Sequence, residues 1–174
     1  MTNDVLALRR AFSRSDELSV AALFFWGRSG TVFLHSLFDD HPEVLTLPAT
    51  RLNSFHGRQW ADIQRQKSVD AMIDRFVHWN ASLFDGTQDR WFEGLDELGN
   101  DRDTPLYVDV ARFGVAMRAL LEGRASSRRR FFVAAHYAYA YARGEDLSRK
   151  RLLLYHLHSP EAYATVDAAL EDFP

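Results

Sequence analysis

The sequence predicts an α/β fold, a three-layer sandwich in which helices flank a mainly parallel β-sheet. Two short segments, 20–26 and 151–157, are almost continuously apolar and contain aromatic residues. Apolar runs that do not alternate with polar residues are typical of strands buried on both faces, as in parallel sheets. Segments with helical patterns and two shorter candidate strands lie between them, and strands that alternate with helices favour a layered sheet. A length of 174 residues fits a single domain, 1–174.

The composition excludes several classes of function. Hydrophobic residues make up 47% of the chain and aromatic residues 13%, which is enough for a sizeable core. No cysteine is present, which excludes a disulfide scaffold, a thiolate zinc site and a cysteine nucleophile. The net charge of −3 gives no sequence-wide basic field for a nucleic acid or an anionic membrane, so neither partner is expected. The polar start lacks a secretory signal and no apolar run could span a bilayer, so a cytoplasmic location is expected.

The first half of the chain is expected to begin with a frayed helix or a cap over 1–18, followed by the strand 20–26. Apolar residues at helical spacing predict a helix over 32–38. A His-Pro pair ends this helix, because proline disfavours the helical conformation of the residue before it. A short strand is expected at 44–47, and a stripe of apolar residues predicts one helix over 59–80.

The second half is expected to contain a polar connection, two strands and three helices. In chain order these are 85–104 (connection), 106–110 (strand), 112–123 and 128–143 (helices), 151–157 (strand) and 160–170 (helix). The last helix opens at a proline, which is favoured in a first turn. Because a strand-then-helix unit is normally followed by another strand, the end of the chain favours a fragment of a longer protein.

A glycine-rich loop, Gly-Arg-Ser-Gly-Thr at 27–31, joins the first strand to the next helix. Its glycines let backbone N–H groups point into one concavity, and the helix start adds unpaired donors and the positive end of a dipole. Arg28 supplies a planar charged fork, and Ser29 and Thr31 supply hydroxyls. The loop therefore predicts a phosphate or sulfate site, although the pattern equally suits a simple turn with Thr31 as a helix cap. A nucleoside-triphosphatase loop fits less well, because it needs four residues between its glycines and then Lys and Ser or Thr.

The loop belongs to a longer pattern, Phe-Phe-Trp-Gly-Arg-Ser-Gly-Thr-Val-Phe-Leu-His-Ser-Leu-Phe-Asp-Asp-His-Pro-Glu-Val-Leu. This segment closely resembles the opening of sulfotransferases that use 3′-phosphoadenosine 5′-phosphosulfate. In that family a strand leads into a loop that cradles the 5′-phosphosulfate. The resemblance implies that Arg28 is the loop cation and that Ser29, Gly30 and Thr31 bind the phosphosulfate. Val32 departs from the family, which usually has a second Ser or Thr there, and one hydroxyl contact would be lost.

The segment Tyr-His-Leu-His-Ser-Pro follows at the carboxyl end of the strand 151–157, the edge where ligands of open α/β sheets gather. Many cytosolic sulfotransferases have a strand that ends in Thr-His-Leu-Pro, whose His is the catalytic base. The resemblance implies that His158 takes the proton from an acceptor hydroxyl, and His156 then stands where those relatives often have Lys. Strand alternation puts both histidines on one face, which also suits a metal pair, but no third ligand is near. Without the resemblance, a histidine that caps the strand end or helix start is the simpler interpretation.

The resemblance implies sulfonate transfer from 3′-phosphoadenosine 5′-phosphosulfate to a hydroxyl or amine of a small-molecule or carbohydrate acceptor, with adenosine 3′,5′-bisphosphate as product. Arg28 and His158 are the expected catalytic residues, and no metal is required. Arg28 and the loop N–H groups would stabilise charge on the leaving phosphate. In the family the 3′-phosphate is held by a later strand, so the chain is expected to be truncated before that strand. The alternative is a non-catalytic or incomplete nucleotide- or anion-binding module of the same fold, and a homo-oligomer is left open.

Other polar and aromatic residues have simpler interpretations. The basic cluster 128–130 is expected to be a solvated helix start, although it could contact a phosphate or an anionic acceptor. The aromatic residues over 131–141 indicate core, although one tyrosine could line an acceptor pocket. Asp109 suits a helix N-cap and equally a position that faces the cleft. The resemblance places substrate or adenine contacts in the region 51–60. The remaining histidines are expected to lie at the surface or hydrogen-bonded in the core: His35, His41, His78 and His136.

Overall fold

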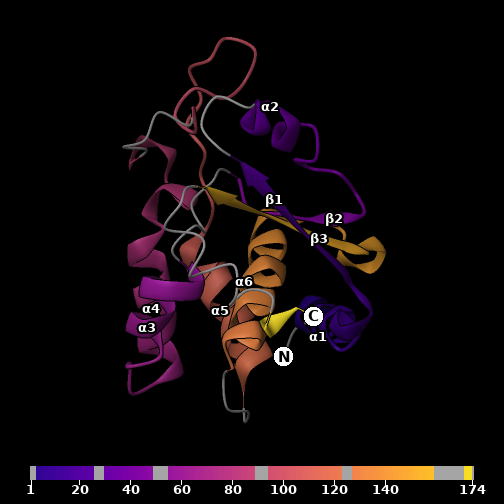
Figure 1. Ribbon diagram of the computed structural model, residues 1–174, viewed down its shortest axis with the longest axis vertical. Coiled ribbons are helices and arrows are strands. Elements are labelled where there is room, and N and C mark those ends of the chain that lie inside the picture. The colour runs from indigo at the N-terminus through magenta and orange to yellow at the C-terminus, as the bar shows by residue number, and fades with distance from the viewer. Residues whose placement is uncertain are drawn as a thin grey trace.

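Three parallel strands form one sheet in the order β1-β3-β2, and helices pack around it (Figure 1). The computed structural model describes residues 3–25, 30–48, 55–88, 94–122, 127–158 and 171–173. The strands in these ranges are β1 Ser19–Phe25, β2 Val44–Leu45 and β3 Leu152–His158. The α-helices are α1 Asn3–Phe12, α2 Thr31–Ser36, α3 Trp60–Ile63, α4 Val69–Trp79, α5 Val110–Leu121 and α6 Arg128–Arg143. The predicted α/β class is confirmed.

The sheet is centred on β3, which pairs with β1 on one side and with β2 on the other. The register of β1 and β3 runs from Ser19 beside Leu152 to Phe25 beside His158. The two strands predicted from continuous apolar runs are confirmed to within one residue at each end. The predicted strand at 44–47 is shorter, at Val44–Leu45.

The two faces of β3 meet different helices. Leu153, Tyr155 and Leu157 belong to the main hydrophobic cluster, where the Tyr155 ring lies 5.1 Å from the ring of Phe132 on α6. His156 points to the other face, because side chains alternate along a strand. The short helix α2 contacts β3 there, and Figure 1 shows α2 on the opposite side of the sheet from α5 and α6. Both faces of β3 are therefore buried, as its apolar sequence predicts.

Two helix starts follow local sequence signals. The hydroxyl of Ser127 accepts a hydrogen bond from the Arg130 N–H at 3.1 Å, and Gly144 in the left-handed conformation (φ 80°) ends α6. The helix predicted over 128–143 is therefore confirmed with the same bounds. The carboxylate of Asp109 accepts from the N–H of Ala111 at 2.8 Å, so the predicted cap of α5 is also confirmed.

The strand predicted at 106–110 is wrong. Tyr107 forms only an isolated bridge to Asp85, and its side chain is 79% exposed. The Asp109 side chain turns the backbone into α5 instead, because its carboxylate satisfies the first free N–H groups of that helix. The apolar run over 106–110 therefore leads into helix α5 instead of forming a strand, and Asp109 near the end of the run caps that helix.

The single helix predicted over 59–80 is also wrong, because it breaks between α3 and α4. The hydroxyl of Ser68 accepts from the Ala71 N–H at 3.1 Å and starts α4 as a new helix. The apolar stripe continues across the break, since Ile63 and Ile73 both lie in the main hydrophobic cluster. The helix predicted over 160–170 lies outside the described residues. Among the helices that are described, none has the length and apolar character needed to cross a membrane.

A buried lysine ties the short strand β2 to the start of β3. Lys150 donates from Nζ to the carbonyl of Val44 at 2.8 Å, to the carbonyl of His41 at 3.2 Å and to Oε2 of Glu145 at 2.7 Å. The side chain of Lys150 is only 2% exposed, so its charge depends on these three acceptors.

Candidate functional site

The predicted site lies at the edge of the sheet where β1 and β3 end side by side. Phe25 is the last residue of β1 and pairs directly with His158, the last residue of β3. Neighbouring strands lie about 4.8 Å apart, so position 158 adjoins the chain that enters the predicted loop. Arg28 and Ser29 lie outside the described residues, as do the side chains of Thr31 and His158, so their roles stay predictions.

Gly30 marks the end of this loop and the start of α2. Its backbone is left-handed (φ 72°, ψ 11°), and its carbonyl accepts from the Leu34 N–H at 2.9 Å. A Cβ at this position would meet nothing within 4 Å, so the glycine is required by conformation rather than by crowding. Gly30 is therefore the N-cap residue and Thr31 the first helical residue, which makes the interpretation of Thr31 as the cap wrong.

His156 is buried against α2 rather than open to a ligand. Its ring lies 4.0 Å from the ring of His35, and its residue exposure is 2%. His35 in turn places Nε2 2.5 Å from the hydroxyl of Thr46, directly after β2. The pair therefore connects α2 to both β3 and the segment that follows β2.

Burial keeps this histidine pair neutral. It lowers the pKa of His156 to about 3, with a further decrease from nearby His35, and it lowers the pKa of His35 to about 4. Both rings are therefore uncharged near neutral pH. His156 thus supplies no positive charge at this position of β3.

A carboxyl group with an unusual pKa lies beside the pair. Asp39 Oδ1 is 3.8 Å from His35 Nε2, and burial raises the pKa of Asp39 to about 6, against the opposing effect of Arg143. In the described ranges, no group of three His, Cys, Asp or Glu side chains could hold a metal ion. The histidine pair of α2 and β3 is therefore a packing contact in this arrangement.

The basic cluster at the start of α6 differs from the expected solvated helix start. Arg128 Nε donates to Asp172 Oδ2 at 2.6 Å, and its side chain is 19% exposed. His56 Nδ1 lies 3.5 Å from the same oxygen, so residues from three parts of the chain meet there. Burial lowers the pKa of His56 to about 4, with Asp172 opposing the shift. Sequence reasoning missed this cluster, whose only signal was the acidic pair at 171–172.

Most other candidates belong to the core, as expected. His136 is fully buried, and its Nδ1 lies 2.8 Å from the carbonyl of Phe132. Tyr139 donates its hydroxyl hydrogen to the carbonyl of Leu83 at 2.7 Å, inside the same hydrophobic cluster. Trp60 is buried in that cluster as well, which differs from the substrate or adenine contacts expected in the region 51–60.

Comparisons with protein-family models, with curated proteins and with solved structures find no match to this chain. The candidate site therefore depends on the sequence pattern and on the geometry described above.

Proposed function

We propose that this chain transfers a sulfonate group from 3′-phosphoadenosine 5′-phosphosulfate to a hydroxyl or amine acceptor. The observation that carries the proposal is the register of the sheet, in which Phe25 pairs with His158. This register brings the two segments that resemble sulfotransferases, separated by more than a hundred residues in sequence, to one edge. Ligands of parallel α/β sheets bind at this edge.

The described end of the loop supports the same proposal. Gly30 adopts the left-handed conformation that lets successive N–H groups turn toward one point. The contacts of α2 and α6 with opposite faces of β3 are those expected of the three-layer sandwich, which we propose as the complete architecture.

Each residue then has a defined part in the reaction. Arg28 and the N–H groups of Ser29, Gly30 and Thr31 would bind the 5′-phosphosulfate and stabilise the negative charge that develops on the departing phosphate. His158 would accept the acceptor proton as the acceptor oxygen bonds to sulfur and the bond from sulfur to the bridging phosphate oxygen breaks. The products are the sulfonated acceptor and adenosine 3′,5′-bisphosphate, and the proton remains on His158 until solvent removes it.

Calorimetric titration with adenosine 3′,5′-bisphosphate, with ATP as the comparison ligand, tests the binding half of the proposal. We expect saturable binding that prefers the bisphosphate. Arg28→Ala should weaken it about tenfold or more, because it removes charge-assisted hydrogen bonds worth about 1.5–3 kcal/mol each. Arg102→Ala is the matched control, because Arg102 is exposed and paired with Glu97 on the surface. No saturable binding, or equal weakening by both substitutions, would refute the proposed nucleotide site.

Release of adenosine 3′,5′-bisphosphate in the presence of phenol, alcohol, amine and sugar acceptors tests the catalytic half. His158→Ala should lower turnover about a hundredfold while nucleotide affinity stays within about threefold, because the base acts on the acceptor. His41→Ala is the control, since His41 is exposed. Binding without turnover toward any acceptor would instead support the non-catalytic anion-binding module.

A further inference from the structure

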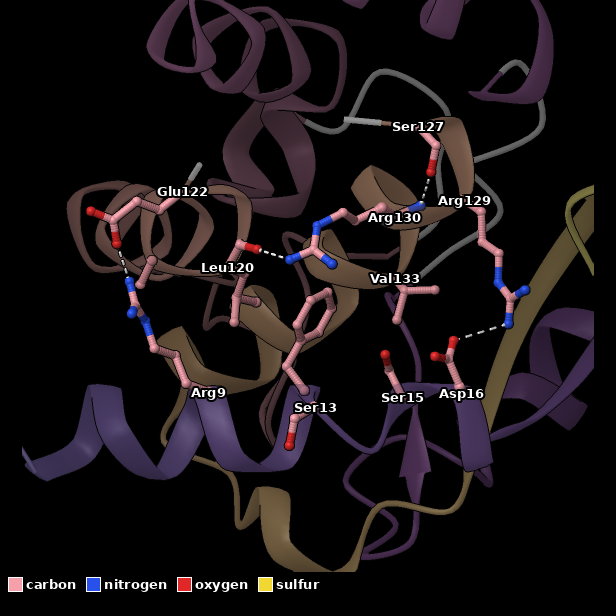
Figure 2. Close-up of a pocket in the computed structure, with 12 residues that line it drawn as sticks. Arg9, Ser13, Ser15, Asp16, Leu120, Glu122, Ser127, Arg129, Arg130 and Val133 are labelled. Carbon is pink, nitrogen blue, oxygen red and sulfur yellow. Dashed lines mark hydrogen bonds and ion pairs between the residues drawn. The ribbon is translucent and has the colours of Figure 1, made fainter. Parts of the chain in front are cut away.

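A cavity of about 460 Å³ lies between the end of α1, the end of α5 and the start of α6 (Figure 2). Ser15 and Asp16 line it, and both lie in the turn Ser15–Glu17, a few residues before the start of β1. The predicted loop follows the other end of β1, and a seven-residue strand is about 20 Å long. The cavity is therefore separate from the candidate site at the carboxyl edge of the sheet.

Three arginines from two helices line this cavity: Arg9 of α1 and Arg129 and Arg130 of α6. Only two carboxylates, Asp16 and Glu122, are among the lining residues, so the lining has an excess of positive charge. The first turn of α6 contains no acidic residue to offset it. Such a concentration of guanidinium groups favours an anionic occupant.

Arg130 lines the cavity, and two contacts hold its side chain in place. Its Nη2 donates to the carbonyl of Leu120 at 2.5 Å, and its Cζ lies 5.0 Å from the centre of the Phe12 ring. Figure 2 shows the Arg130 side chain extending from α6 toward Leu120 at the end of α5. This guanidinium is thus positioned before any ligand arrives, which reduces the cost of ordering it on binding.

Arg9 and Arg129 are held by carboxylates that are easily displaced. Arg9 pairs with Glu122, whose side chain is 72% exposed, and Arg129 lies 3.5 Å from Asp16, whose side chain is 93% exposed. Exposed ion pairs contribute little to stability, so an incoming anion could replace them. Within the described part of the chain, Arg9 Nε is buried and has no hydrogen-bond partner.

We propose that this cavity binds a small organic phosphate. Guanidinium groups arriving from different helices match the three terminal oxygens of a phosphate better than the single plane of a carboxylate. The hydroxyls of Ser15 and Ser127 add polar groups, while Phe12 and Val133 offer an apolar surface for the organic part. The volume is within the range of small-molecule sites.

Titration with phenyl phosphate and with inorganic phosphate tests the proposal on the whole chain. We expect phenyl phosphate to bind more tightly than inorganic phosphate, and Arg9→Gln and Arg129→Gln each to weaken its binding about tenfold. Both arginines are partly exposed, so neither substitution should prevent folding, which a thermal melt without ligand would check. Arg102→Gln, in a surface pair outside the cavity, is the matched control and should leave the affinity unchanged.

Removal of a competing carboxylate is expected to change the affinity differently under the two interpretations of the Arg9–Glu122 pair. Glu122→Gln should strengthen phenyl phosphate binding by about threefold or more, because Arg9 is then free to bind the ligand. A purely structural role for the Arg9–Glu122 pair predicts unchanged or weaker binding, and that result would overturn the proposal. Loss of phosphate binding in Arg28→Ala with no change in Arg9→Gln would overturn it as well, because the phosphate would then occupy the predicted loop.

Discussion

Replacement of Lys150 by Met should strongly destabilise the fold, because it leaves buried acceptors unpaired. Methionine has a similar length but cannot donate to the carbonyls of Val44 and His41 or to the Glu145 carboxylate. Breaking one side of a buried ion pair costs about 3–5 kcal/mol, and burying the apolar methionine side chain recovers part of this. We expect a net loss of about 3 kcal/mol in the free energy of unfolding.

Urea unfolding followed by circular dichroism measures this loss. With a slope of about 1–3 kcal/mol per molar urea, the midpoint should fall by at least about 1 M. Lys67→Met is the matched control, since Lys67 is exposed and should change the free energy of unfolding by less than about 0.5 kcal/mol. A second variant, Lys150→Met with Glu145→Gln, should recover only a small part of the loss, because Arg143 Nε lies 3.4 Å from Glu145 Oε1 and still pairs with that carboxylate in Lys150→Met. If Lys150→Met shifts the midpoint no more than Lys67→Met, the reasoning from buried hydrogen bonds is refuted.

Two further predictions concern stability. Burial lowers the pKa of His136 from 6.5 to about 4, so the unfolded chain binds this proton first and stability falls as pH decreases from about 6.5 toward 4. Between pH 6 and 5, His136→Leu should reduce the pH slope of unfolding free energy by about 1.2 kcal/mol per pH unit, and an unchanged slope would contradict this. A Cβ on Gly86 would lie 2.0 Å from the carbonyl oxygen of Leu95, so Gly86→Ala should cost more than about 2 kcal/mol. Gly94→Ala, where φ is 74° and the space is open, should cost only about 1–2 kcal/mol, and equal melting temperatures for the two variants would refute the steric argument.

The elements that the sequence predicts well are those with local signals at both ends. Helix α6 has a serine before its first residue and a left-handed glycine after its last, and both act through adjacent backbone groups. Strand β3 is recognisable because burial on both faces requires apolar residues at nearly every position. For α6 the decisive interactions lie within a few residues in sequence, whereas β3 is recognised from the apolar composition of the segment itself.

The features that escaped prediction depend on contacts between distant residues. The sequence around Lys150 does not indicate that this lysine is buried. Its acceptor in β2, the carbonyl of Val44, is more than a hundred residues away in sequence. The Arg128–Asp172 contact joins the start of α6 to the segment 171–173. The cavity lined by Arg9 likewise depends on α1, α5 and α6 together. For the candidate site, the sequence predicted an edge location for the two motifs, and the Phe25–His158 register places the end of the first strand beside the second motif. The roles of individual loop side chains stay predictions, because Arg28 and Ser29 lie outside the described residues.

The histidine pair links helix α2, which starts at the end of the predicted loop, to strand β3. Gly30 starts α2, and His35, five residues later, contacts both Thr46 and His156. Position 158 is two residues beyond His156 on the same strand, so short and rigid connections link Gly30 to the proposed base. Catalysis by preorganised donors requires this kind of support from residues that do not touch the substrate. A lysine at position 156 would be costly, because its charge would be buried beside His35.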